Sequence, residues 1–149
     1  MKKLLKKLTF QYYLVYVAAT LTAVIGFQLN RSGVFIDPAS SLGIALNSIL
    51  IIFLIGSIPI TLAIFNKKAK QWALLEDVQE RFMRYRKGSE IRLLIIGLGF
   101  ILGVLFFFLT NSQSMIFCAG ISAIALFFCK PAEVKIISEL QIEDPDQYL

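Results

Sequence analysis

Residues 66–92 (NKKAKQWALLEDVQERFMRYRKGSEIR) form the only long polar segment between the two strongly apolar halves of the chain. The segment holds eight of the 15 Lys and Arg residues and four of the 10 Asp and Glu residues. Each half contains two apolar runs separated by a short connection. Because runs of about 20 apolar residues bounded by charge are typical of membrane spans, this pattern predicts two helical hairpins in a membrane, joined by a basic connector.

The polar segment itself has the periodicity of an amphipathic helix. At 3.6 residues per turn its apolar side chains share one face, and most of its charged side chains lie opposite. The apolar face consists of Trp72, Leu75, Val78, Phe82 and Tyr85. We therefore expect a connector helix over residues 66–90, which Gly88 ends and after which Ser89 caps the next helix. The apolar face suits lipid headgroups as well as the protein's own bundle or a second copy.

The whole chain is more apolar than an average soluble domain, since 57% of its 149 residues are hydrophobic. We predict an all-α integral membrane protein with four transmembrane helices, arranged as two antiparallel hairpins joined by a cytosolic amphipathic helix. A single membrane domain would cover residues 1–149. The expected spans are residues 8–29, 42–65, 91–110 and 114–129, the connector is residues 66–90, and the cytosolic tail is residues 130–149.

Basic residues are distributed unevenly between the two sides of this arrangement. Four lysines precede the first span and eight basic residues lie in residues 66–92, whereas Arg31 is the only one in the two opposite loops. The positive-inside rule then predicts that both termini and the connector are cytosolic, in a bacterial cytoplasmic (inner) membrane. The net charge of +5 reflects this topology and does not predict nucleic-acid binding. We interpret the MKKLLKK start and the run after it as a retained span, because no small-residue cleavage site ends the run.

Small residues in the last two spans predict where those helices pack. Gly99 and Gly103 form a GxxxG pattern in the third span, and Ala119 and Ala123 lie in the fourth. The turn at residues 111–113 is so short that the two spans must be antiparallel neighbours. Since small side chains allow helices in a membrane to approach closely, we expect these four residues to form the helix-packing contact.

The sequence contains no recognisable catalytic chemistry. It has no histidine, the commonest general base and metal ligand. The interiors of the four apolar runs lack Asp, Glu, Lys and Arg, on which ion-coupled and proton-coupled transporters depend. Glu76 and Glu80 share a helix face, but the arginines beside them favour an ion-paired surface over a metal site. We therefore predict a protein that is not an enzyme and that has no cofactor and no bound metal.

Two classes of function stay open. The first is a small membrane protein that acts through protein or lipid contacts, as a subunit, an assembly or accessory factor, or a homo-oligomer. The second is a small transporter or channel for a neutral or lipophilic solute. Its pathway would be lined by neutral polar residues, namely Asn47, Ser48, Thr61, Asn111 and Ser122.

One surface is the candidate for such contacts. It consists of Trp72, Arg81, Arg84, Arg86 and Lys87, which would lie close to the membrane on the cytosolic side. The predicted partners are the lipid bilayer with its anionic headgroups and another membrane protein or a second copy, with no nucleic acid. The acidic tail, residues 139–146, would fold over these cations and compete with a partner. The alternative is that the cations only fix the orientation of the protein in the membrane.

Overall fold

The computed structural model describes residues 2–142, and every regular element among them is a helix. The helices are α1 (Lys2–Arg31), α2 (Ser41–Ala73), α3 (Val78–Thr110), α4 (Gln113–Phe128) and α5 (Glu133–Leu140). The all-helical fold predicted from the sequence is therefore confirmed.

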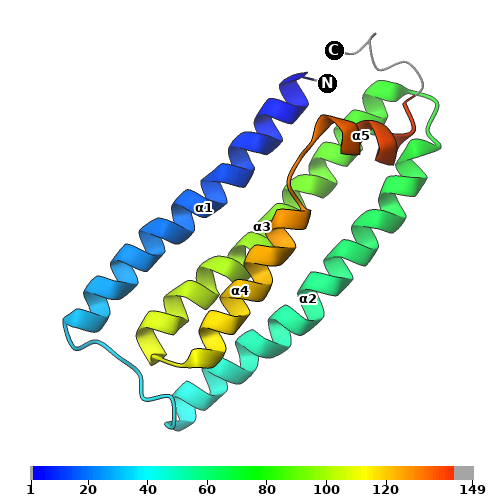
Figure 1. Ribbon diagram of the computed structural model, residues 1–149. Coiled ribbons are helices and arrows are strands. Elements are labelled where there is room, and N and C mark those ends of the chain that lie inside the picture. Colours follow the sequence, from blue (N-terminus) through cyan, green and yellow to red (C-terminus); the bar gives the residue numbers. More distant parts are fainter. Residues whose placement is uncertain (1, 143–149) are drawn as a thin grey trace.

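Helix α3 is the centre of the molecule. It packs against α1 on one side and against α2 and α4 on the other (Figure 1). Helices α3 and α4 form a close hairpin, as their short connection requires. Helices α1 and α2 do not form a packed pair, because α3 lies between them. The predicted pairing of the first two spans is thus not the arrangement that the structure describes.

The start of α1, the α2–α3 turn and α5 lie together at one end of the bundle (Figure 1). We call this end, which contains residues 2–7 and 66–90 with α5, the basic end. Helix α5 bends away from α4 by 72° and packs against α2. A core forms here that joins four helices. Its fully or nearly fully buried members include Leu8, Phe65, Phe82, Tyr85, Ile136 and Leu140.

The expected connector helix is interrupted. Helix α2 continues to Ala73, the chain turns, and α3 begins at Val78. Asp77 explains the start of α3, because its extended backbone and its carboxylate, which accepts a hydrogen bond from the Gln79 N–H at 2.8 Å, form an N-cap. The apolar face predicted for one helix is therefore divided between two helices. Phe65 of α2 contacts the ring of Trp72 on the same helix and the ring of Tyr85 on α3.

The predicted stop at Gly88 is also wrong, since α3 continues through Gly88 and Ser89. Gly88 has a packing role in its place. A Cβ atom there would overlap the Trp72 indole, lying 3.0 Å from its Cζ3 atom. Helix α3 ends at Thr110, where Asn111 takes the left-handed conformation with φ of 50°.

Three helices are long and apolar enough to cross a membrane, namely α1, α2 and α3, which is compatible with an integral membrane protein. They have 30, 33 and 33 residues, so each is at least about 45 Å long and exceeds a hydrocarbon layer of about 30 Å. Large apolar side chains such as Leu21, Ile52, Ile55 and Leu94 are exposed on their outer faces. Helix α4 has only 16 residues, and it becomes a fourth candidate only together with α5 as a bent pair.

The glycines of α3 lie against different neighbours. A Cβ atom on Gly103 would lie 3.0 Å from the Ala119 nitrogen and 3.1 Å from its Cα, so α3 and α4 touch through their backbones. Gly99 faces Leu54 of α2 and the Ser122 hydroxyl of α4. Ala119 is buried and Ala123 is half-buried.

We expect Gly103→Leu to destabilise the protein by about 1–3 kcal/mol or more, because the backbone of Ala119 cannot move aside as a flexible side chain would. The measurement is thermal unfolding of the purified chain in mild detergent. Gly120→Leu is the matched control, since a Cβ atom there has no neighbour within 4 Å. Equal stability of the two variants would show that the α3–α4 contact does not depend on Gly103.

Candidate functional site

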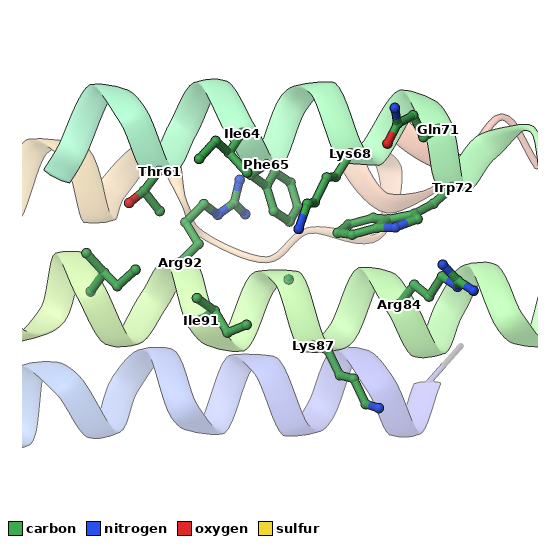
Figure 2. Close-up of a pocket in the computed structure, with 12 residues that line it drawn as sticks. Thr61, Ile64, Phe65, Lys68, Gln71, Trp72, Arg84, Lys87, Ile91 and Arg92 are labelled. Atoms are coloured by element: carbon green, nitrogen blue, oxygen red, sulfur yellow. The ribbon is translucent and has the colours of Figure 1, made fainter.

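A groove between α2 and α3 at the basic end is the candidate site. It has a cavity volume of about 450 Å³ (Figure 2). The residues that line it are Thr61, Ile64, Phe65, Lys68, Gln71 and Trp72 of α2 with Arg84, Lys87, Gly88, Ile91, Arg92 and Ile95 of α3. On each helix these residues recur at intervals of one, three or four, which places them on one face of that helix.

The lining combines positive charge with apolar area. Four cations line the groove, namely Lys68, Arg84, Lys87 and Arg92, and none of the twelve lining residues is acidic. Lys68 and Arg92 extend into the space between α2 and α3, whereas the Lys87 ammonium points away from α2 (Figure 2). Aromatic and branched aliphatic side chains supply most of the remaining wall, to which Thr61, Gln71 and Gly88 also contribute (Figure 2). Such a lining suits an anion that also carries an apolar portion, because the cations attract the charge while the walls exclude water.

Arg92 is the unusual residue of this groove. It is only 3% exposed, and its Nε has no hydrogen-bond partner among residues 2–142. Its guanidinium carbon lies 3.7 Å from the centre of the Phe65 ring, a cation–π contact. None of the four ion pairs in the described part of the chain includes Arg92. A buried cation without a counter-charge is costly, and a cation–π contact worth about 2 kcal/mol offsets only part of that cost.

Sequence reasoning missed Arg92, because we counted it with the basic residues that flank the third span. A signal for its burial was present. Arg92 follows Tyr85 by seven residues, or about two turns, and so continues the apolar face on which Tyr85 lies.

The structure does not gather the predicted contact surface into one patch. Trp72, Arg84 and Lys87 line the groove. Arg81 donates hydrogen bonds to the backbone oxygens of Leu75 and Leu140, so it holds the α2–α3 turn and the end of α5 in place. Arg86 does not line the groove.

The other two arginines of this surface have acidic partners within α3. Arg84 pairs with Glu80 at 2.6 Å at the rim of the groove. Arg86 pairs with Glu90 at 2.9 Å, and Lys7 of α1 lies 3.5 Å from the same carboxylate. Lys87 has no ion pair in the described residues, so the groove keeps an excess of positive charge.

The first acidic residue of the predicted tail segment does not cover the groove. Glu139 of α5 accepts a hydrogen bond from the Tyr85 hydroxyl at 2.6 Å on the inner side of the bundle. Burial raises the pKa of Tyr85, and the bond to Glu139 raises it further, so the phenol stays protonated and continues to donate. The rest of the predicted tail, residues 143–149, lies outside the described residues.

The residues proposed for a solute pathway do not share one lining. Thr61 lines the groove, but the Asn47 amide lies 3.4 Å from the Ser112 hydroxyl near the opposite end of the bundle. The Ser122 hydroxyl donates to the Cys118 carbonyl within α4. Ser48 and Asn111 are exposed.

Comparisons with known family models, with curated proteins and with solved structures found no match to this chain. Within residues 2–142, no three His, Cys, Asp or Glu side chains lie close enough together to hold a metal ion.

We expect Arg92→Met to stabilise the lipid-free protein by about 1–4 kcal/mol, because a packed apolar side chain replaces a buried cation that has no ion pair among residues 2–142. Chemical or thermal unfolding in detergent at low phosphate concentration measures the change. Lys87→Met is the control, since Lys87 is exposed and its replacement should change stability by no more than about 0.5 kcal/mol. A clear loss of stability in Arg92→Met would mean that the fold itself requires the cation.

Proposed function

We propose that this chain is a non-enzymatic, four-span protein of a bacterial cytoplasmic membrane that acts by binding an anionic membrane component in the α2–α3 groove. The observation that carries the proposal is the buried Arg92, which has no ion pair among residues 2–142, in a groove whose twelve described lining residues include three more cations and no acid. The bound component is a lipid headgroup or an acidic group of a membrane partner, which makes the protein an accessory subunit or a lipid-dependent factor.

The distribution of charge supports a cytosolic position for the basic end. The lysines of residues 2–7 and the eight basic residues of residues 66–92 lie at the same end of the bundle (Figure 1). At the opposite end Arg31 is accompanied by Asp37. In this orientation, the groove lies at the depth of the inner-leaflet headgroups, where anionic lipids concentrate.

Helix α4 is the proposed fourth span. Its outer face exposes Phe117, Ile121, Ile124 and Phe128. A 16-residue helix is about 24 Å long, so the bilayer would thin slightly around it. A crossing by α4 returns the chain to the side on which α1 begins, which places both termini in the cytosol.

Binding fits the groove better than catalysis does. The lining supplies fixed positive charge and apolar area, whereas a general base needs a carboxylate, an imidazole or another group that exchanges a proton near neutral pH. The twelve lining residues include none of these groups.

A small transporter or channel for a neutral or lipophilic solute is the second candidate. It is favoured by two buried polar atoms of α2, Asn47 Oδ1 and Ser57 Oγ, which have no hydrogen-bond partner among the described residues. Unpaired acceptors inside a bundle would suit a solute that donates hydrogen bonds.

The topology is tested by labelling single cysteines in intact cells. In a chain with Cys118 and Cys129 replaced by Ala, we expect Ser32→Cys to react with an impermeant maleimide and Glu76→Cys to stay unlabelled until the cells are permeabilised. Both positions are exposed, so a failure to react reports the side of the membrane and not burial. Labelling of Glu76→Cys from outside would overturn the orientation.

Lipid retention tests the binding function. We expect the purified chain to retain phosphatidylglycerol in preference to phosphatidylcholine in native mass spectrometry. Since each juxtamembrane cation contributes about 1 kcal/mol, the double change Lys68→Gln and Lys87→Gln should weaken retention by roughly thirtyfold. Lys2→Gln with Lys3→Gln is the control, because it removes the same charge away from the groove. Equal retention of both lipids would contradict the proposal, and solute flux through liposomes that contain the chain alone would favour the second candidate.

A further inference from the structure

We propose that the groove selects a membrane amphiphile whose headgroup carries more than one negative charge, a phosphate monoester or a diphosphate, and that Arg92 binds the phosphate. This inference rests on the proposed function and specifies its ligand. The occupant is a lipid, held by its headgroup at the basic end and by its apolar portion along the inner part of the groove.

The number of unpaired cations sets the charge of the ligand. Lys68, Lys87 and Arg92 have no ion pair in the described residues, and Arg84 shares its charge with Glu80. Lys68 and Arg92 extend into the space between the helices (Figure 2), so a phosphodiester lipid with one negative charge would leave at least one of these two cations unbalanced. A phosphate monoester carries about −1.5 to −2 at pH 7, and a diphosphate carries more, so both match the groove more closely.

The position of Arg92 makes it the residue that distinguishes these headgroups. Lys68 and Lys87 are exposed, so water and salt screen their charges. Arg92 is 97% buried, so its charge acts in a medium of lower dielectric constant. A second negative charge on the phosphate therefore increases the attraction to Arg92 more than the attraction to the exposed lysines. A planar guanidinium also binds two phosphate oxygens at once, which an ammonium cannot do. The Phe65 ring holds this guanidinium at the wall of the groove.

The other residues that line the groove determine where the apolar portion of the lipid would lie. Ile91 and Ile95 follow Lys87 by about one and two turns on α3, and Ile64 and Thr61 line the groove from α2. These residues lead from the cations toward the middle of the bundle. A soluble phosphate would contact the cations but would leave this apolar wall uncovered, so the lining favours a lipid over a free anion.

Trp72 provides a direct probe, because it is the only tryptophan of the chain and it lines the groove. The full-length chain is reconstituted in phosphatidylcholine nanodiscs at pH 8. Lipids with brominated acyl chains are then added, and quenching of Trp72 fluorescence reports their occupancy of the groove. The headgroups compared are phosphatidic acid, a monoester, and phosphatidylglycerol, a diester, and soluble pyrophosphate competes as the free anion.

We expect phosphatidic acid to bind at least about tenfold more tightly than phosphatidylglycerol, the ratio that corresponds to one well-placed charge interaction of about 1.4 kcal/mol. Arg92→Gln should remove most of this preference while it changes phosphatidylglycerol binding less than about threefold. Arg92→Lys should restore only part of the preference, and it also serves where Arg92→Gln does not fold. Arg86→Gln, which removes a cation outside the groove, should leave the preference unchanged.

The outcomes separate this inference from the proposed function. If phosphatidic acid and phosphatidylglycerol bind equally but both exceed phosphatidylcholine, the selectivity is refuted and the anionic-lipid function stands. If no anionic lipid exceeds phosphatidylcholine, both are refuted. If pyrophosphate displaces phosphatidic acid at equal concentration, the ligand is a soluble anion and the lipid assignment is overturned. A preference that persists in Arg92→Gln and in Arg92→Lys refutes the role of Arg92.

Discussion

The close approach of three helices to α3 is the constraint on which the rest of the structure depends. In a bilayer the apolar faces of helices gain little from leaving lipid, so helices associate through tight van der Waals contact, which small residues permit. The glycines of α3 meet this requirement on different sides. Gly97 faces Val15 of α1, Gly99 faces Leu54 of α2, Gly103 faces Ala119 of α4, and Gly88 faces the Trp72 ring. Helix α3 can therefore pack closely against three other helices and be the core of the bundle, although it is not strongly apolar along its whole length.

The same packing determines the shape of the groove. Because Gly88 has no side chain, the Trp72 indole lies directly on the backbone of α3 and narrows the space between the two helices at that level. One turn further along α3, the Arg92 guanidinium lies over the Phe65 ring, and these two side chains occupy the space between the helices. The α2–α3 turn, which the Asp77 cap and the two hydrogen bonds of Arg81 stabilise, keeps the two walls in register.

Periodicity and charge in the sequence predicted that the chain is helical, that it has the long apolar helices of a membrane protein, and that α3 and α4 adjoin. Periodicity did not predict that the polar segment folds on itself. An apolar face such as that of Phe82 and Tyr85 indicates that the face is buried, but it does not identify the element that covers it. In the structure, α2, the start of α1 and α5 cover this face. Asp77 lies within the connector helix predicted over residues 66–90, whereas in the structure its short carboxylate caps the N-terminus of α3. Arg92 could not be placed in a groove before the position of α2 was known.

A comparison of two arginines of α3 supports the proposal that Arg92 binds a ligand. Arg81 and Arg92 are 11 residues apart, or about three turns, and both are directed at structure that packs on α3. Arg81 is satisfied, because backbone oxygens of Leu75 and Leu140 accept its hydrogen bonds. The Arg92 guanidinium contacts the face of the Phe65 ring, and its Nε has no hydrogen-bond acceptor among the described residues. A buried cation without an acceptor lowers the stability of the free protein, and none of the twelve described lining residues is acidic. Both observations support the proposal that an anion completes the site when it binds.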